Sequence, residues 1–257
     1  IDVVYTSGLF DPEWYLESNP DVAESGINPL EHYYFNGFKE GRSPNYLFDP
    51  IWYLSKYSDV EQAGMEPLEH FIRYGEAESR NPSLYFDTGF YRLTTGLQES
   101  ESALKHYLDH AKQPVSSPNK YFEPSYYLDT YLDIAEAGLD PYKHFICQGF
   151  SECRNPSIDF DIQYYVQTHL GGDASINAFY HYLSEGIDVG LAIKTNQQTE
   201  QNQHIDLSSN FIQDSYLKAG PGFEDFKYGE RSHDTQVKAI AYYLPQFHPF
   251  KENSEWW

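Results

Sequence analysis

The chain is poor in cysteine and in basic residues, and it has no long apolar run. It holds two cysteines, Cys147 and Cys153, which is too few for a disulfide-based scaffold. Lys and Arg number 17 against 39 Asp and Glu, a formal net charge of −22 over 257 residues. Such a surface repels phosphate backbones and anionic lipid, and no segment approaches the ~20 apolar residues of a membrane span. We expect no nucleic-acid partner and no membrane span.

The N-terminal segment lacks the basic region and the apolar stretch of a signal peptide. With two cysteines that we interpret as reduced thiols, this predicts a cytoplasmic protein; a surface or secreted protein is the weaker alternative. The sequence starts without Met and ends on Trp256 and Trp257, so we expect it to be part of a longer protein.

Aromatic residues are abundant, with 24 Tyr, 17 Phe and 4 Trp, and many of them recur at a fixed spacing. Four similar segments begin at Leu9, Leu47, Tyr85 and Tyr121, and a weaker fifth runs from about Asp159 to Ala192; we call them copies 1 to 5. The leading aromatic residues are 38, 38, 36 and 38 positions apart: Phe10, Phe48, Phe86, Phe122 and Phe160. This periodicity is typical of a repeat protein.

Each copy has the pattern of short helices. Asp11-Pro12 is typical of a helix start, Asn19-Pro20 interrupts that helix, and Gly26 ends a second one. Asn28-Pro29 restarts a third helix, which ends at Gly37. Because such helices cannot bury their aromatic side chains alone, stacked neighbours must cover them. The sequence therefore predicts an all-α array of about five units of 36–38 residues over residues 9–194.

Two sets of polar residues recur with the copies. One histidine per copy stands in the third helix, and an arginine follows a Glu-x pattern in copies 1, 2 and 4. Histidines one unit apart are too distant to share a metal, so we interpret them as structural residues that cap helices or bond between units. The arginines predict a clasp between units, with ligand binding as the alternative. The residues are His32, His70, His106, His144, His181, Arg42, Arg80 and Arg154.

One aromatic position in the first helix of each copy could serve packing or sugar stacking. It is occupied by Trp14, Trp52, Phe90 and Tyr126 in the first four copies. We favour packing and keep a sugar-binding platform as the alternative. The chain shows no nucleophile, dinucleotide-binding or phosphate-binding motif and no calcium-binding loop, so we expect no cofactor and no metal.

The C-terminal part differs from the copies. Residues 195–236 are interpreted as a linker and an irregular segment, and residues 237–244 have the pattern of a buried strand that ends at Pro245. Because a lone strand has no partner to pair with, residues 237–257 are interpreted as the truncated start of a further domain.

The segment AIAYYLPQFHPFKENSEWW resembles the opening of WbsX-like glycosyltransferases, also described as family 99-like glycoside hydrolase domains. The resemblance implies a (β/α)-barrel whose first strand is this one. It also implies sugar contacts from Tyr243, Gln246, His248 and Trp257, with the catalytic carboxylates downstream. The copies are similar to the FDPxYYLxxNPDVAxAG repeats that precede such domains in bacterial polysaccharide-synthesis proteins.

These observations lead to one main functional hypothesis. The copies are the non-catalytic scaffold or interaction region of a bacterial polysaccharide-assembly glycosyltransferase, with a possible protein partner on the array. A glycan or sugar nucleotide would bind through the missing domain. The alternative is a carbohydrate-binding module that grips the glycan polymer. In either case we expect no glycosyl transfer or hydrolysis by this chain alone, because the acid and base groups of such chemistry are not assembled in it.

Overall fold

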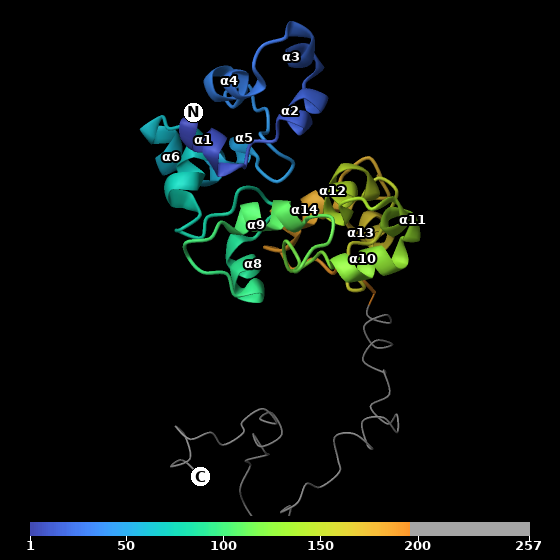
Figure 1. Ribbon diagram of the computed structural model, residues 1–257. Helices are drawn as coiled ribbons and strands as arrows, with labels where there is room; N and C mark the ends of the chain where they lie inside the picture. The colour runs from blue at the N-terminus through green and yellow to red at the C-terminus, as the bar shows by residue number, and fades with distance from the viewer. Residues whose placement is uncertain (196–257) are drawn as a thin grey trace, which may run out of the picture. The chain divides into compact units, whose positions relative to one another are not determined.

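The computed structural model describes residues 1–195, and regular structure there is almost entirely helical (Figure 1). The only extended structure in this part is three isolated β-bridges. Each joins two residues three positions apart at the start of a copy: Asn45 and Phe48, Ser83 and Phe86, and Ser157 and Phe160. The prediction of an all-α region is therefore confirmed for the described residues. The predicted linker, the strand at 237–244 and the sugar-contact candidates Tyr243, Gln246, His248 and Trp257 lie outside them.

The helices are short, and their order is the same in copies 1, 2 and 4, whereas copies 3 and 5 lack the second helix and copy 3 also lacks the π-helical turn. Helix α1 (Asp2–Ser7) precedes copy 1. Copy 1 holds α2 (Pro12–Ser18), α3 (Pro20–Ser25), α4 (Pro29–His32) and the π-helical turn η1 (Tyr33–Gly37); copy 2 holds α5 (Pro50–Lys56), α6 (Ser58–Ala63), α7 (Pro67–His70) and η2 (Phe71–Gly75); copy 3 holds α8 (Thr88–Thr95) and α9 (Ala103–His110); copy 4 holds α10 (Pro124–Thr130), α11 (Leu132–Ala137), α12 (Pro141–His144) and η3 (Phe145–Gly149); copy 5 holds α13 (Ile162–His169), α14 (Ala178–His181) and η4 (Tyr182–Gly186).

Side-chain caps explain where these helices start. Asp11 accepts a hydrogen bond from the Trp14 N–H at 3.0 Å, which satisfies one of the free donors of the first turn. Asp49, Asp87 and Asp161 cap α5, α8 and α13 in the same way, whereas Glu123 makes no such bond at the start of α10. The second helix of copy 1 ends at Gly26 in the left-handed conformation, with φ 69°.

The core is built from the aromatic residues that recur with the copies. In every copy one tyrosine of the first helix is fully buried. It packs against the leading phenylalanine and the residue after the histidine, as Tyr53 does with Phe48 and Phe71 at centroid distances of 5.3 and 6.0 Å. The buried tyrosines are Tyr15, Tyr53, Tyr91, Tyr127 and Tyr165. Aromatic content thus serves a recurring core position.

The start of the third helix is where copies meet, some of them successive and some further apart in the chain. The buried Glu66 caps α7 of copy 2 and also accepts a hydrogen bond from the Tyr33 hydroxyl of copy 1 at 2.8 Å. The Glu76 carboxylate of copy 2 accepts from Ser102 and from the Leu104 N–H at the start of α9 in copy 3, both at 3.0 Å. Asp140, at the start of α12 in copy 4, accepts from the Tyr46 hydroxyl.

Candidate functional site

The repeated histidines lie in one arrangement throughout. In each copy the Nδ1 atom of the histidine hydrogen-bonds the hydroxyl of the buried tyrosine of the same copy. The distance is 3.0 Å for Tyr53 and His70, and 2.8 Å for Tyr165 and His181. The bond joins the first helix to the third and so closes the copy on itself. The expectation that these rings bond between units was therefore wrong: His32, His70, His106, His144 and His181 bond within their own copies.

In copies 1, 2, 4 and 5 a glycine five residues after the histidine faces the tyrosine hydroxyl, whereas copy 3 makes the same bond, Tyr91 to His106 at 2.9 Å, without one. A Cβ atom on Gly75 would lie 2.1 Å from the Tyr53 hydroxyl oxygen, which is an impossible contact, and Gly37, Gly149 and Gly186 face their tyrosines in the same way. In each of these copies the glycine ends a π-helical turn. Copy 3 has Ala111 at the corresponding place, and its α9 continues as a regular helix to His110.

The arginines form a second fastening inside copies 1, 2 and 4. Arg80 donates to both carboxylate oxygens of Asp59 at 2.9 Å and to Glu78 at 2.6 Å, and its guanidinium lies 4.9 Å from the centre of the Tyr57 ring. Arg42 holds Asp21 and Glu40, and Arg154 holds Asp133 and Glu152, with the same atoms. The predicted clasp exists, but it closes each copy and does not link one copy to the next.

These contacts shift the pKa values of the histidines and acids that take part in them. Burial, reinforced by the Arg80 charge, lowers the pKa of His70, and the same causes with Arg154 lower the pKa of His144. Hydrogen bonds from the arginines lower the pKa of Asp21, Asp59 and Asp133. Burial raises the pKa of Glu66 and of Asp140. The neutral form of His70 and of His144, and charged arginine–aspartate pairs, are the states that this arrangement favours near neutral pH.

The variable aromatic position of the first helix is half-buried in the first four copies, at Trp14, Trp52, Phe90 and Tyr126. The Trp14 ring meets the edge of Tyr46 at 6.1 Å, and the Lys143 ammonium lies 4.9 Å from its centre. Its Nε1–H is buried and has no hydrogen-bond partner. This position thus serves packing in part and keeps an open edge, so the two expectations for it both retain support.

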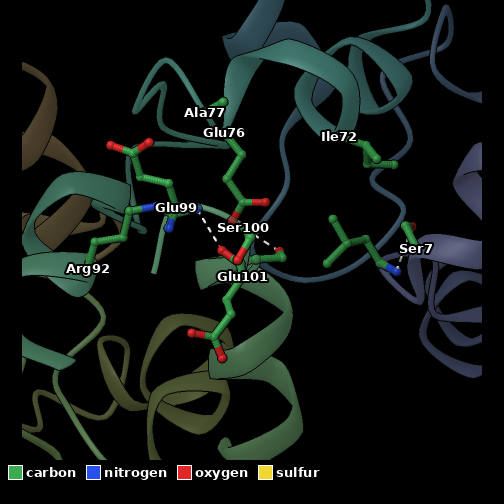
Figure 2. Close-up of a pocket in the computed structure, with 10 residues that line it drawn as sticks. Ser7, Ile72, Glu76, Ala77, Arg92, Glu99, Ser100 and Glu101 are labelled. Carbon is green, nitrogen blue, oxygen red and sulfur yellow. Dashed lines mark hydrogen bonds between the residues drawn. The ribbon is translucent and has the colours of Figure 1, made fainter. Parts of the chain in front are cut away.

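Two cavities lie at contacts between copies. Figure 2 shows the first, of about 220 Å³, where the Glu76 side chain reaches toward the segment around Ser100. Arg92 in its wall donates to the carbonyl oxygens of Gln98 and Glu101 at 2.8 and 2.7 Å, so its charge is already engaged. The second, of about 330 Å³, is lined by Trp14, Lys143 and other residues of copies 1 and 4.

No cluster of three or more His, Cys, Asp or Glu side chains within residues 1–195 is placed to hold a metal ion. Both cysteines are exposed free thiols. None of the described helices has the length and apolar character that crossing a membrane requires. Comparison of the chain with protein-family models, with curated proteins and with solved structures found no match.

Three acids lie at the junctions between copies and were not expected from the sequence: Glu66, Glu76 and Asp140. A signal was present for two of them, because Glu66 and Asp140 stand directly before a proline, where a cap is expected. Their second role, accepting a tyrosine hydroxyl from another copy, depends on how copies stack. Nothing in the period of the repeat specifies that stacking.

Proposed function

We propose that residues 9–194 are an array of five repeated helical units that serves as the non-catalytic scaffold or interaction region of a bacterial polysaccharide-assembly glycosyltransferase. The parent enzyme, on this proposal, is WbsX-like and carries its barrel and its catalytic carboxylates after residue 237. The array acts in the cytoplasm and holds the enzyme or a protein partner in place.

The proposal rests on the contacts of the repeated histidines and arginines, which are made with residues of their own copies. A general acid or base needs a position facing a substrate, yet the five histidines bond buried tyrosines of their own copies. The arginines that recur with them are held by aspartate and glutamate at 2.6–2.9 Å in copies 2 and 4. Residues used in this way stabilise a framework, which is the property that a scaffold needs.

The proposal predicts that the 257-residue chain alone transfers and hydrolyses no sugar. The measurement is turnover of UDP-, GDP- and dTDP-sugars with bacterial glycan acceptors, and of oligosaccharides in a separate hydrolysis assay. Turnover that disappears in Glu66→Gln or His70→Gln, with the fold retained, would make the copies an enzyme and contradict the proposal.

The reading frame beyond Trp257 tests the assignment to a glycosyltransferase. The proposal expects it to continue into a domain with alternating strands and helices and with paired carboxylates. Removal of residues 9–194 from the full protein should leave transfer to a short soluble acceptor intact while abolishing polymer assembly in the cell. A frame that stops shortly after Trp257 would contradict the assignment.

The second candidate is a carbohydrate-binding module, and Trp14 is the observation that favours it. Its half-buried ring and the adjoining cavity with Lys143 offer an aromatic edge and a cation to a sugar acid. Titration of the chain with alginate and with dextran, followed by tryptophan fluorescence, distinguishes the candidates. Binding that Trp14→Phe weakens, and that Trp52→Phe leaves unchanged, favours the module; no binding of either polymer favours the scaffold.

A further inference from the structure

The residue directly before the repeated histidine touches a copy boundary that lies far before it in the sequence. In copies 3, 4 and 5 it meets a residue just before a leading phenylalanine. The pairs are Lys105 with Gly8, Lys143 with Tyr46, and Tyr180 with Tyr85. Because the same contact recurs with the period of the copies, the described chain coils, and each of these third helices rests on an earlier boundary.

The contact made by copy 4 depends on a charge. The Lys143 ammonium lies 4.9 Å from the centre of the Trp14 ring of copy 1 and 5.7 Å from the centre of the Tyr46 ring. Ion pairs of lysine within residues 1–195 are confined to Lys105 and Lys194, so two aromatic rings hold the Lys143 ammonium. The matching contact of copy 5 joins two tyrosine rings at 6.2 Å, and no charge takes part in it.

A buried hydrogen bond accompanies this cation. The Tyr46 hydroxyl donates to Asp140, and the same carboxylate caps the third helix of copy 4 by accepting from the N–H groups of Tyr142 and Lys143. One short segment of copy 4 thus carries both the acid and the cation that reach copy 1 and its boundary with copy 2. We call Trp14, Tyr46, Asp140 and Lys143 the latch.

The closed latch is narrow and leaves polar groups poorly solvated. The indole N–H of Trp14 is buried without a hydrogen-bond partner, which costs free energy that contact with water would recover. Burial also raises the pKa of the Asp140 carboxyl. Two cavities of about 380 and 330 Å³ adjoin the latch, and Asp140 and Lys143 line both. Few atoms therefore join copies 1 and 4, and part of their stabilisation is offset.

We propose that the latch is a conformational device with a closed and an open state, and that the Lys143 ammonium keeps it closed. In the closed state copies 1 and 4 are held at one distance, and the array is stiff across this turn of the coil. In the open state Trp14 and Asp140 are hydrated and copies 1 and 4 move apart, while the junctions between successive copies are retained. The latch is independent of whether the chain belongs to a glycosyltransferase.

Distances between pairs of spin labels measure the latch in the whole 257-residue chain, with both native cysteines changed to serine. One pair is attached at Glu24→Cys and Glu136→Cys, which are exposed positions of copies 1 and 4. The control pair is attached at Gln62→Cys and Ala174→Cys, which are exposed positions of copies 2 and 5. Each pair should give one narrow distance distribution when the latch residues are the natural ones.

Substitutions of lysine test the role of the charge. Lys143→Met removes the ammonium and should broaden the distribution between copies 1 and 4 and shift it to longer distances, while the control pair is unchanged. Lys143→Arg should restore the narrow distribution, because a guanidinium also stacks on aromatic rings. Lys112→Met is the matched control, since Lys112 is exposed, lines one of the same cavities and is not part of the latch; it should leave both distributions unchanged.

Trp14→Leu removes the other side of the contact and tests the latch independently of Lys143. It should broaden the same distribution, and the double variant Trp14→Leu with Lys143→Met should broaden it no further, because both changes remove one contact. Thermal melting checks that each variant is folded. A narrow distribution in folded Lys143→Met, or equal broadening in both label pairs, would overturn the proposal, because the ammonium would then hold nothing or the whole array would have loosened.

Discussion

At the residue scale the tightest constraint is the glycine that faces the tyrosine hydroxyl. Gly75→Ala places a methyl group against the Tyr53 oxygen, which a Cβ would approach to 2.1 Å. Although Ala favours helix over Gly, we expect a loss of ~1–3 kcal/mol in the free energy of unfolding from overpacking. Urea denaturation measures it.

The matched control for that substitution is Gly89→Ala in α8. Its Cβ would meet only the Asp87 carboxylate, at 3.7 Å, so the change should be neutral or stabilise by up to ~1 kcal/mol. Tyr53→Phe should recover part of the Gly75→Ala loss, since it removes the clashing hydroxyl. Equal losses for both glycines, or no recovery, would contradict the close contact.

The tyrosine–histidine bond gives a second prediction, for pH. Burial and the Arg80 charge hold the pKa of His70 below its ordinary value of 6.5. The unfolded chain therefore binds the proton more readily, and the contribution of His70 to stability is present above pH 6.5 and is lost as the pH falls through the folded-state value.

The pKa of Glu66 is raised, so its contribution to stability increases as the pH falls, opposite to that of His70. To isolate the effect of His70, the natural chain is compared with His70→Gln. The natural chain should lose stability more steeply between about pH 7 and 5, with a difference in slope of at most ~1.4 kcal/mol per pH unit for one proton. Urea denaturation across that range measures both slopes, and parallel slopes would mean that the ring is merely solvated.

At the scale of helices, most starts and stops could be predicted from Asp-Pro, Asn-Pro and Gly, because a cap acts within a few residues of itself. The π-helical turns could not, since the glycine that ends each of them faces the hydroxyl of a tyrosine far from it in the sequence, as Gly75 faces Tyr53 in copy 2. The arginine clasp was likewise expected between units, although Arg80 binds Asp59 of its own copy. Asp59 is 21 residues away, and sequence spacing alone does not say that the chain folds back at that distance.

Caps provide the prediction at this scale. Asp49→Ala removes the hydrogen bond to the Trp52 N–H at 2.9 Å and should cost ~1 kcal/mol of unfolding free energy. Glu123 occupies the same position in copy 4 but makes no cap bond, so Glu123→Ala should change stability by less than ~0.5 kcal/mol. Urea denaturation of both variants checks this, and a larger loss for Glu123→Ala would show that cap geometry does not explain the helix starts.

At the scale of the whole described chain, each copy is closed internally and is joined to others at the start of its third helix. Copies 1, 2 and 4 have the arginine fastening, whereas copy 3 has only a hydroxyl pair, Thr94 with Ser116 at 2.7 Å, at the matching place. A repeat protein of this kind depends on nearest neighbours for much of its stability. The period of the copies could be predicted from the sequence, but their stacking rests on single contacts such as Tyr33 to Glu66.

Native-state hydrogen exchange, measured by mass spectrometry on the natural chain and on Gly75→Ala, tests this account most directly. We expect the substitution to reduce protection in copy 2 and in copies 1 and 3, which contact it through Glu66 and Glu76, while copy 5 keeps its protection. Loss of protection confined to residues 71–76 would contradict the account, because the copies would then be independent of one another.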